Sequence, residues 1–261
     1  LNEDRGSYKK AESYFLESLE IAKKNNNEFD LHISYFYLGG FYKEIGLLDK
    51  AENYYLKALS IREKLYGKEY YGLATTLNNL GEIYLIKGFH EKAKVYYLRS
   101  LSLREKELGE NHPDVSFNHM WLGDLYLEIT NYEKAEDYYL KALSIRKKVF
   151  GNNNHLVANS LFWLGYLNKA KGDFKKSEDF YLNCLYIQEN LFGETNSDIA
   201  ITLNWLGDLY QEQGEFKKAE KNYLRALKIN RELFGENNKL VAGNLQFLGQ
   251  LFQSQGLYKK A

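Results

Sequence analysis

Proline and cysteine are almost absent from this sequence, and each absence excludes a class of structure. Only one Pro and one Cys occur in 261 residues. Because Pro interrupts helices and central strands alike, its rarity favours long helices, and the 20 Gly residues are then the natural helix breakers. The single thiol, Cys184, excludes an internal disulfide and a metal site built from several cysteines.

Net charge and long apolar runs are also missing. The chain carries 35 Lys and Arg against 35 Asp and Glu, so its formal net charge is zero. No global positive field therefore holds nucleic acid or an anionic membrane. No apolar run approaches the roughly 18 residues of a membrane-spanning helix, and no signal peptide opens the chain. We expect a cytoplasmic protein without nucleic-acid or membrane partners. Its start at Leu1 rather than Met suggests a piece of a longer protein.

What the sequence does contain is a repeat, which is the first feature to look for in any chain. A Leu-Gly pair recurs at a constant step of 42 residues, with its leucine at Leu38, Leu80, Leu122, Leu164, Leu206 and Leu248. A second marker keeps the same step at Ala51, Ala93, Ala135, Ser177, Ala219 and Ala261. Each marker sits in an apolar pattern of helical spacing. We call the helix with Leu-Gly helix A and the helix with the Ala marker helix B.

Two helices of this length cannot bury their apolar faces alone, but stacked pairs can. The sequence therefore predicts an all-α α-solenoid of stacked helix pairs. We expect a lone helix B over 1–29, full repeats over 30–71, 72–113, 114–155, 156–197 and 198–239, and a partial repeat over 240–261. The Gly of each Leu-Gly pair lies inside a helix, where it costs about 1 kcal/mol against Ala, so it indicates close contact between helices.

Glycine separates the two helices of most repeats, and one repeat lacks it. Thr130-Asn131 stands in its place. Asn is the residue that follows Gly in tolerance of a left-handed backbone, so we expect Asn131 to adopt that conformation.

The repeated residues resemble a known family. Leu and Gly of helix A, the Tyr three residues later and the Ala that opens helix B are similar to the tetratricopeptide repeat. The 42-residue step, with "LNNLGEIY" (77–84), "AENYYLKALSIREKLYG" (51–67) and "GENHPDV" (109–115), resembles the kinesin-light-chain type of that family. The resemblance implies a right-handed superhelix of antiparallel helix pairs, in which helices A line a concave surface that binds a protein or peptide partner.

One column of helix A carries three successive tryptophans. At about 100° per residue, Trp205 lies opposite the stripe that faces helix B, and Trp121 and Trp163 are its equivalents. Two interpretations remain open. Each Trp packs against helix A of the next repeat, or the column forms an exposed aromatic surface for a ligand, since exposed apolar patches and Trp both mark interaction sites. Both interpretations can hold at once, if one edge of each indole is packed and the other edge is exposed to a ligand.

Neighbouring columns add amides and carboxylates, which suit a peptide. Asn and Gln can hydrogen-bond a peptide backbone in both directions, and carboxylates favour Lys or Arg on the ligand, although a solvated acidic face is the alternative for the carboxylates. The predicted partner-binding residues are Tyr37, Asn78, Asn79, Glu82, Met120, Trp121, Asp124, Phe162, Trp163, Tyr166, Asn204, Trp205, Asp208 and Gln246. We expect a peptide or helix with apolar and basic residues.

Signs of catalysis are absent from the sequence. No phosphate loop, paired-His metal motif or nucleophile elbow occurs, so we expect no enzyme, no cofactor and no metal. His119 and Cys184 occupy core positions of their helices and are interpreted as packing residues. On helix B, Arg62, Arg104 and Arg146 share one column that we expect to be solvated.

Three classes of function are compatible with these features. A protein-interaction scaffold is the leading one. The alternative is a sensor or regulatory module of a larger multidomain protein with an attached effector domain. A nucleic-acid binder that uses the basic residues of helix B comes third.

Overall fold

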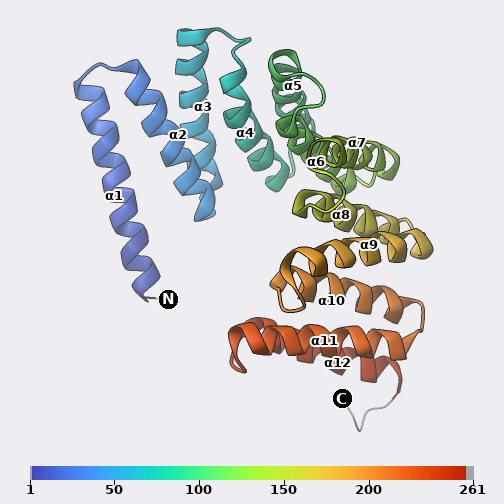
Figure 1. Cartoon of the computed structure of the whole chain (residues 1–261). Coiled ribbons are helices and arrows are strands. Elements are labelled where there is room, and N and C mark those ends of the chain that lie inside the picture. The colour runs from blue at the N-terminus through green and yellow to red at the C-terminus, as the bar shows by residue number, and fades with distance from the viewer. Residues whose placement is uncertain (1, 257–261) are drawn as a thin grey trace. The chain divides into compact units, whose positions relative to one another are not determined.

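The computed structural model describes residues 2–256, with side chains from residue 7, and contains helices and no strands over that range (Figure 1). The helices are α1 (Asn2–Lys24), α2 (Glu28–Glu44), α3 (Leu48–Tyr66), α4 (Ala74–Ile86), α5 (His90–Leu108), α6 (Pro113–Glu128), α7 (Tyr132–Phe150), α8 (His155–Ala170), α9 (Phe174–Phe192), α10 (Ser197–Glu212), α11 (Phe216–Phe234) and α12 (Lys239–Ser254). A short 3-10 helix, η1 (Tyr71–Leu73), precedes α4. Even-numbered helices carry the Leu-Gly pair and odd-numbered helices carry the Ala marker, as helices A and B. The partial repeat expected over 240–261 lies, from residue 257 on, outside the described residues.

The helices form two compact units. The first unit ends at Thr130 and holds α1 to α6, and the second begins at Asn131 and holds α7 to α12. Within each unit, helices pack against their neighbours along the chain. Both units are thus stretches of an all-α repeat solenoid.

Close contact between helix A and the following helix B explains the Leu-Gly pair. A Cβ atom at Gly81 would lie 2.5 Å from the ring of Tyr97, and one at Gly207 would lie 2.5 Å from the ring of Tyr223. Both tyrosines are almost fully buried, at 1% exposure. The helical glycine therefore leaves room for one buried tyrosine in each of these pairs, as its position inside a helix predicts.

The turn between α6 and α7 corrects one prediction. Thr130, not Asn131, takes the left-handed backbone, with φ 56°. Asn131 has φ −87° and caps α7, where its side chain accepts a hydrogen bond from the backbone N–H of Lys134 at 3.2 Å. Thr130 is in register with Gly88 and Gly172, which also have positive φ, so the left-handed position falls on a β-branched residue that disfavours it.

The arginine column of helix B also differs from expectation. Arg104 and Arg146 are 9% and 1% exposed, so the prediction of a solvated column was wrong. Arg104 donates to the side-chain carbonyl of Asn118 at 2.5 Å. Arg146 donates to the carbonyl of Leu156 at 2.9 Å and to the hydroxyl of Ser160 at 2.8 Å. Acceptors on the following helix A therefore compensate the guanidinium groups for their loss of water.

Candidate partner-binding surface

The tryptophan column lies on helices A, and two of its tryptophans, Trp121 and Trp163, stack on the preceding helix B. Trp121 stacks on Tyr97 of α5, with ring centroids 6.3 Å apart and an interplanar angle of 9°. Trp163 stacks in the same way on Tyr139 of α7, at 6.5 Å and 24°. Both tryptophans remain half-buried. These contacts are made with the preceding repeat, not with helix A of the next one, so each indole has one packed face and one accessible part.

The two ends of the column carry smaller aromatic rings. Tyr37 stacks on Phe15 of α1 at 6.3 Å and is 56% exposed. Phe247 stacks on Tyr223 of α11 at 5.5 Å and is 40% exposed. Stacking on the preceding helix B is thus common to four of the six positions of the column.

Four half-buried aromatic residues of α8 and α10 form what we call the aromatic cluster: Phe162, Trp163, Tyr166 and Trp205. Trp205 meets Tyr166 edge to face, with centroids 5.0 Å apart, and meets Phe162 at 6.3 Å. Trp163 contacts Phe162 and Tyr166 at 5.7 Å each. These edge-to-face contacts hold the rings in fixed orientations. The cluster is therefore a contiguous, partly exposed aromatic surface within the second unit.

Most of the predicted amides are used inside the protein. Asn78 is buried and accepts a hydrogen bond from the side-chain amide of Asn118 at 3.1 Å. Asn204 is half-buried and accepts from Asn244 at 2.7 Å. Met120 is buried as well, at 6% exposure. Burial thus removes Asn78 and Met120 from the accessible surface, because cross-repeat hydrogen bonding and core packing occupy them.

Asn79 and Gln246 are more accessible than the buried amides. Asn79 is half-buried, donates to the carbonyl of Thr75 at 3.0 Å and accepts from the ammonium of Lys43 at 2.8 Å. Gln246 is exposed. Of the predicted amides, Gln246 is therefore the one that most freely faces solvent.

The predicted carboxylates have lysine partners that the sequence analysis missed. Lys43 of α2 pairs with Glu82 of α4 at 2.7 Å. Lys169 of α8 pairs with Asp208 at 2.8 Å and with Glu212 at 2.5 Å, both on α10. Each lysine lies 39 residues before its first partner, a spacing that places the two on adjacent helices A and that could have revealed the pairs.

Lys169 keeps its charge in this setting. Burial by itself would lower the pKa of Lys169, but its hydrogen bonds to Asp208 and Glu212 outweigh burial and hold the pKa above its usual value. Asp124, the remaining predicted carboxylate, is half-buried on α6. The acidic side chains of the surface are thus already partly neutralised by the protein.

The interpretation of Cys184 and His119 as packing residues agrees with their burial. Cys184 is fully buried, its Sγ lies 3.8 Å from the hydroxyl of Thr202, and burial raises the pKa of its thiol to about 12. His119 is 7% exposed. Within residues 7–256, no three His, Cys, Asp or Glu side chains are placed to hold a metal ion together. Over the described helices, none is both long and apolar enough to cross a membrane.

Known structures with the same fold come from several kinds of protein. BtubC (BKLC) from P. vanneervenii is 24% identical, with a TM-score of 0.75 over 89% of this chain and 94% of that one. A putative kinesin light chain of Podosopora anserina with nearly identical TPR-like repeats is 16% identical, with a TM-score of 0.67 over 76% and 94%. A signal transduction ATPase with numerous domains and a tetratricopeptide repeat sensor, from Pyrococcus horikoshii, is 21% identical, with a TM-score of 0.72 over 98% and 37%.

The family assignment rests on the sequence itself. A search of curated proteins gives no match. The family model of the tetratricopeptide repeat matches in five overlapping copies, at residues 30–106, 72–148, 116–190, 156–231 and 198–261. The similar structures include kinesin-light-chain-like members of that fold. This chain therefore belongs to the tetratricopeptide repeat family.

Proposed function

We propose that this chain binds a peptide or a helical segment of a partner protein on the helix-A faces of its units. Tetratricopeptide repeats in general mediate protein–protein interaction. The observation that supports this face is the aromatic cluster, because its four rings are oriented by one another and are still partly exposed. Rigid, partly exposed aromatic residues are common energetic centres of interfaces.

The proposed contact surface omits the two buried residues of the predicted set. In the first unit it comprises Tyr37, Asn79, Glu82, Trp121 and Asp124. In the second it comprises Phe162, Trp163, Tyr166, Asn204, Trp205, Asp208 and Gln246. Apolar side chains of the ligand would contact the aromatic rings, and a basic side chain would approach the carboxylates.

The ligand's basic side chain would compete with Lys169 for Asp208 and Glu212. Substituting Lys169→Met keeps an unbranched side chain, removes the charge and frees both carboxylates, which are 41% and 46% exposed and can be solvated. We expect this variant to bind a basic peptide ligand about 3-fold to 10-fold more tightly at low salt. Titration of a fluorescent ligand measures the change. Weaker binding by the variant would show instead that the ligand carries an acidic group at this point.

The first test of the proposal is affinity purification of partners from native lysate, identified by mass spectrometry. The chain is compared with Trp163→Ala/Trp205→Ala, after circular dichroism shows that both are folded. A matched control, Leu140→Ala/Leu224→Ala, removes two exposed apolar side chains from helix B, where both leucines are more than 40% exposed. The proposal expects partners that are lost only in the tryptophan variant. Partners lost equally in the control, or retained by both, would place the interaction elsewhere.

A second function has one observation in its favour. The similar structure from Pyrococcus horikoshii is a protein with a tetratricopeptide repeat sensor, and this chain covers only 37% of it. By analogy of fold, which carries no site information, we propose as the alternative that this array is the sensor of a multidomain protein. The reading frame that surrounds this sequence tests the alternative, since it must then encode an effector domain.

A further inference from the structure

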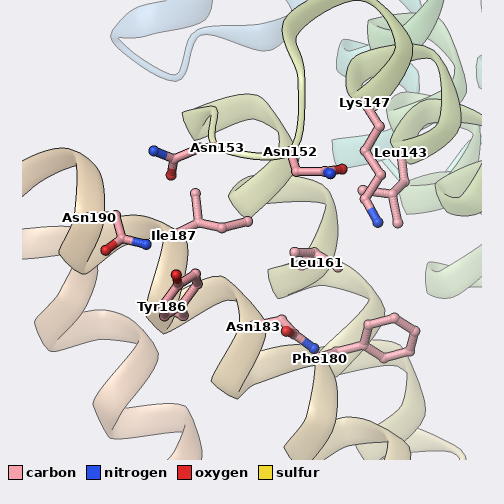
Figure 2. A pocket seen from close by; sticks show the side chains of 10 residues that line it. All are labelled: Leu143, Lys147, Asn152, Asn153, Leu161, Phe180, Asn183, Tyr186, Ile187 and Asn190. Atoms are coloured by element: carbon pink, nitrogen blue, oxygen red, sulfur yellow. The ribbon is translucent and has the colours of Figure 1, made fainter.

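A pocket of about 530 Å³ lies on the helix-B side of the second unit, away from the proposed contact surface. Its floor is apolar, with Leu143, Leu161 and Ile187 all buried and Phe180 half-buried. Its rim is polar and exposed, and is formed by Lys147, Asn152, Asn153, Asn183, Tyr186 and Asn190. Figure 2 shows Lys147 on one side, the residues of α9 across from it, and Asn152 and Asn153 in the loop between α7 and α8. The volume is in the range of pockets that bind small molecules or short chain segments.

An ion pair that closes the equivalent place in other repeats is missing at this pocket. Consecutive helices B are bridged by Arg99 and Glu63 at 2.5 Å in the first unit, and by Arg225 and Glu189 at 2.6 Å in the second. At the pocket, Asn183 and Lys147 occupy the same two positions of the repeat. They lie 84 residues after Arg99 and Glu63, and 42 residues before Arg225 and Glu189. A short amide thus replaces the arginine, and a lysine replaces the glutamate. The bridge cannot form, and the space between α7 and α9 stays open.

Three further rim positions differ from their equivalents in other repeats, and two of them, Asn190 and Asn152, are uncharged where the others are charged. Asn190 stands where other repeats have Lys64, Lys106, Lys148 and Glu232. Asn152 stands where they have Lys68, Glu110, Glu194 and Glu236. Tyr186 stands where they have Ser60, Ser102, Ser144 and Lys228. Lys147 is consequently the single ionised side chain among the lining residues.

The rim groups are available for a ligand. Within the described part of the chain, no acidic side chain pairs with Lys147, and no side chain or backbone group holds the amides of Asn152, Asn153 and Asn190. Asn183 uses its side-chain NH₂ to bond the carbonyl of Asp179 at 2.8 Å, and its side-chain oxygen is left as an acceptor. The pocket therefore offers one cation, several amide donors and acceptors, and an apolar floor.

We propose that this pocket binds a short extended peptide segment of a partner protein that carries an acidic residue next to an apolar one. The carboxylate would pair with Lys147, since a lone exposed ammonium selects an anion. The asparagines would bond the peptide backbone, because each amide side chain provides both a donor and an acceptor. The apolar residue would cover Leu161 and Ile187 on the floor. The preferred charge is opposite to that proposed for the helix-A faces, so the two sites would take different ligands.

The experiment uses a variant that restores the missing bridge, Lys147→Glu/Asn183→Arg. The same two residue types already pair twice in this protein, so the variant is expected to fold and to close the pocket. A phage library of random 12-residue peptides is selected on the immobilised chain, with the variant in solution as competitor. Enriched peptides are then synthesised with a fluorescent label, and their affinities for both proteins are measured by anisotropy.

The proposal expects enriched peptides with Asp or Glu beside an apolar residue and at least 10-fold weaker binding to the variant. Trp163→Ala/Trp205→Ala should bind these peptides with unchanged affinity. A result that overturns the pocket therefore leaves the proposed function of the helix-A faces untouched, and the reverse also holds. Enrichment of basic peptides, equal affinity for both proteins, or no enrichment would overturn the proposal. An RNA oligonucleotide serves as a second probe, and RNA binding that is lost in the variant would overturn the peptide as the ligand.

Discussion

Glycine and tyrosine at fixed positions determine how closely helices A and B approach. The ring of Tyr97 lies where a Cβ atom at Gly81 would be, and the same holds for Tyr55 at Gly39 and for Tyr181 at Gly165. A helical glycine costs about 1 kcal/mol against alanine, so these positions give up helix propensity in exchange for burial of a tyrosine. The benefit depends on the neighbouring ring and not on the glycine alone.

Substituting Gly81→Ala is expected to lower the free energy of unfolding by about 2 kcal/mol, as overpacking in a filled core does. The matched control is Gly243→Ala in α12, where a Cβ would meet nothing within 4 Å. Because the control only gains helix propensity, it should raise stability by up to about 1 kcal/mol. Urea unfolding followed by circular dichroism measures both. Effects of the same sign would show that packing against Tyr97 does not decide the outcome.

Thr130 is the residue at which backbone conformation and residue type disagree. Its φ of 56° is one that a β-branched side chain disfavours, at about 1–3 kcal/mol. Thr130→Gly should therefore stabilise the chain by about 1 kcal/mol, after the larger conformational freedom of glycine in the unfolded state is subtracted. Gly88, with φ 76°, occupies the same position one repeat earlier. Thermal unfolding of Thr130→Gly and of the reciprocal Gly88→Thr should show shifts of opposite sign. A destabilising Thr130→Gly would refute the argument.

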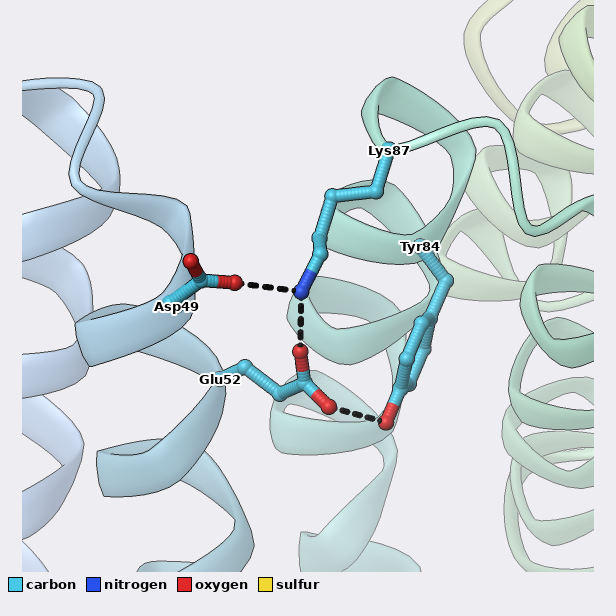
Figure 3. Close-up of polar contacts among 4 residues, drawn as sticks. All are labelled: Asp49, Glu52, Tyr84 and Lys87. Atoms are coloured by element: carbon cyan, nitrogen blue, oxygen red, sulfur yellow. Dashed lines mark hydrogen bonds and ion pairs between the residues drawn. The ribbon is translucent and has the colours of Figure 1, made fainter.

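Between helices, a tyrosine and a glutamate recur as a hydrogen-bonded pair. Tyr84 of α4 donates to Glu52 of α3 at 2.6 Å, and Lys87 donates to Glu52 and to Asp49, also at 2.6 Å (Figure 3). Tyr210 donates to Glu178 at the same distance in the second unit. Burial alone would raise the pKa of Glu52, but the bonds from Lys87 and Tyr84 outweigh it and lower that pKa below its usual value of 4.5.

The lowered pKa of Glu52 has a consequence for the dependence of stability on pH. A carboxyl with a depressed pKa in the folded state stabilises the protein above its unfolded pKa, and this contribution is lost as pH falls through the folded value. Glu52→Gln should therefore lower the urea midpoint at pH 7, and the difference from the unchanged chain should shrink at pH 3. The control is Glu44→Gln, at an exposed position on α2. A difference that persists at pH 3 would mean that the carboxylate charge is not responsible.

The helices and their pairing could be predicted from the sequence because they depend on periodic local features. The 42-residue step, the helical spacing of Leu77, Leu80 and Tyr84, and the glycines at helix ends all repeat along the chain. The Leu-Gly pair also predicted the close approach that Tyr97 and Tyr223 show. These signals act within one helix pair, where sequence distance and contact are closely related.

The surface chemistry was less predictable because it depends on contacts between repeats. Arg146 was expected in solvent, but it reaches Leu156 and Ser160 on the next helix. Asn244 donates to Asn204 on α10 and accepts from Asn230 on α11 at 2.6 Å, so this amide joins three helices. The sequence of a single repeat is the same whether such a polar side chain is solvated or bonded to a neighbouring repeat. Only the stacking of repeats shows which side chains a ligand can reach.

At the scale of the whole molecule, stability depends on the coverage of each helix by its neighbours. Helices within each unit contact those adjacent or next but one in the chain. In such arrays, stability is a sum of local and nearest-neighbour terms. A helix covered on one side should therefore open more readily than one covered on both.

The helix α12 shows this lack of coverage among the described residues. Leu245 is 48% exposed, whereas Leu203, its equivalent one repeat earlier, is 1% exposed. Leu203 is covered because α11 packs on α10, and within residues 2–256 no helix follows α12. The residues YKKA at 258–261 match FKKA at 216–219, so the sequence of α11 supplies a suitable cover.

Adding residues 220–235 of this chain (EKNYLRALKINRELFG) after Ala261 would extend the match to α11 over the length of a whole helix B. Its tyrosine should pack on Gly249, where a Cβ now meets nothing within 4 Å, and its apolar face should cover Leu245. Burial of a leucine is worth about 1.5–3 kcal/mol, so amide hydrogen exchange in α12 should slow at least 10-fold, while exchange in α4 stays the same. The control is the same segment with its residue order scrambled. If both extensions protect α12 equally, added length and not coverage by a neighbouring helix stabilises α12. The stability of this part of the array would then not be a sum of nearest-neighbour contacts.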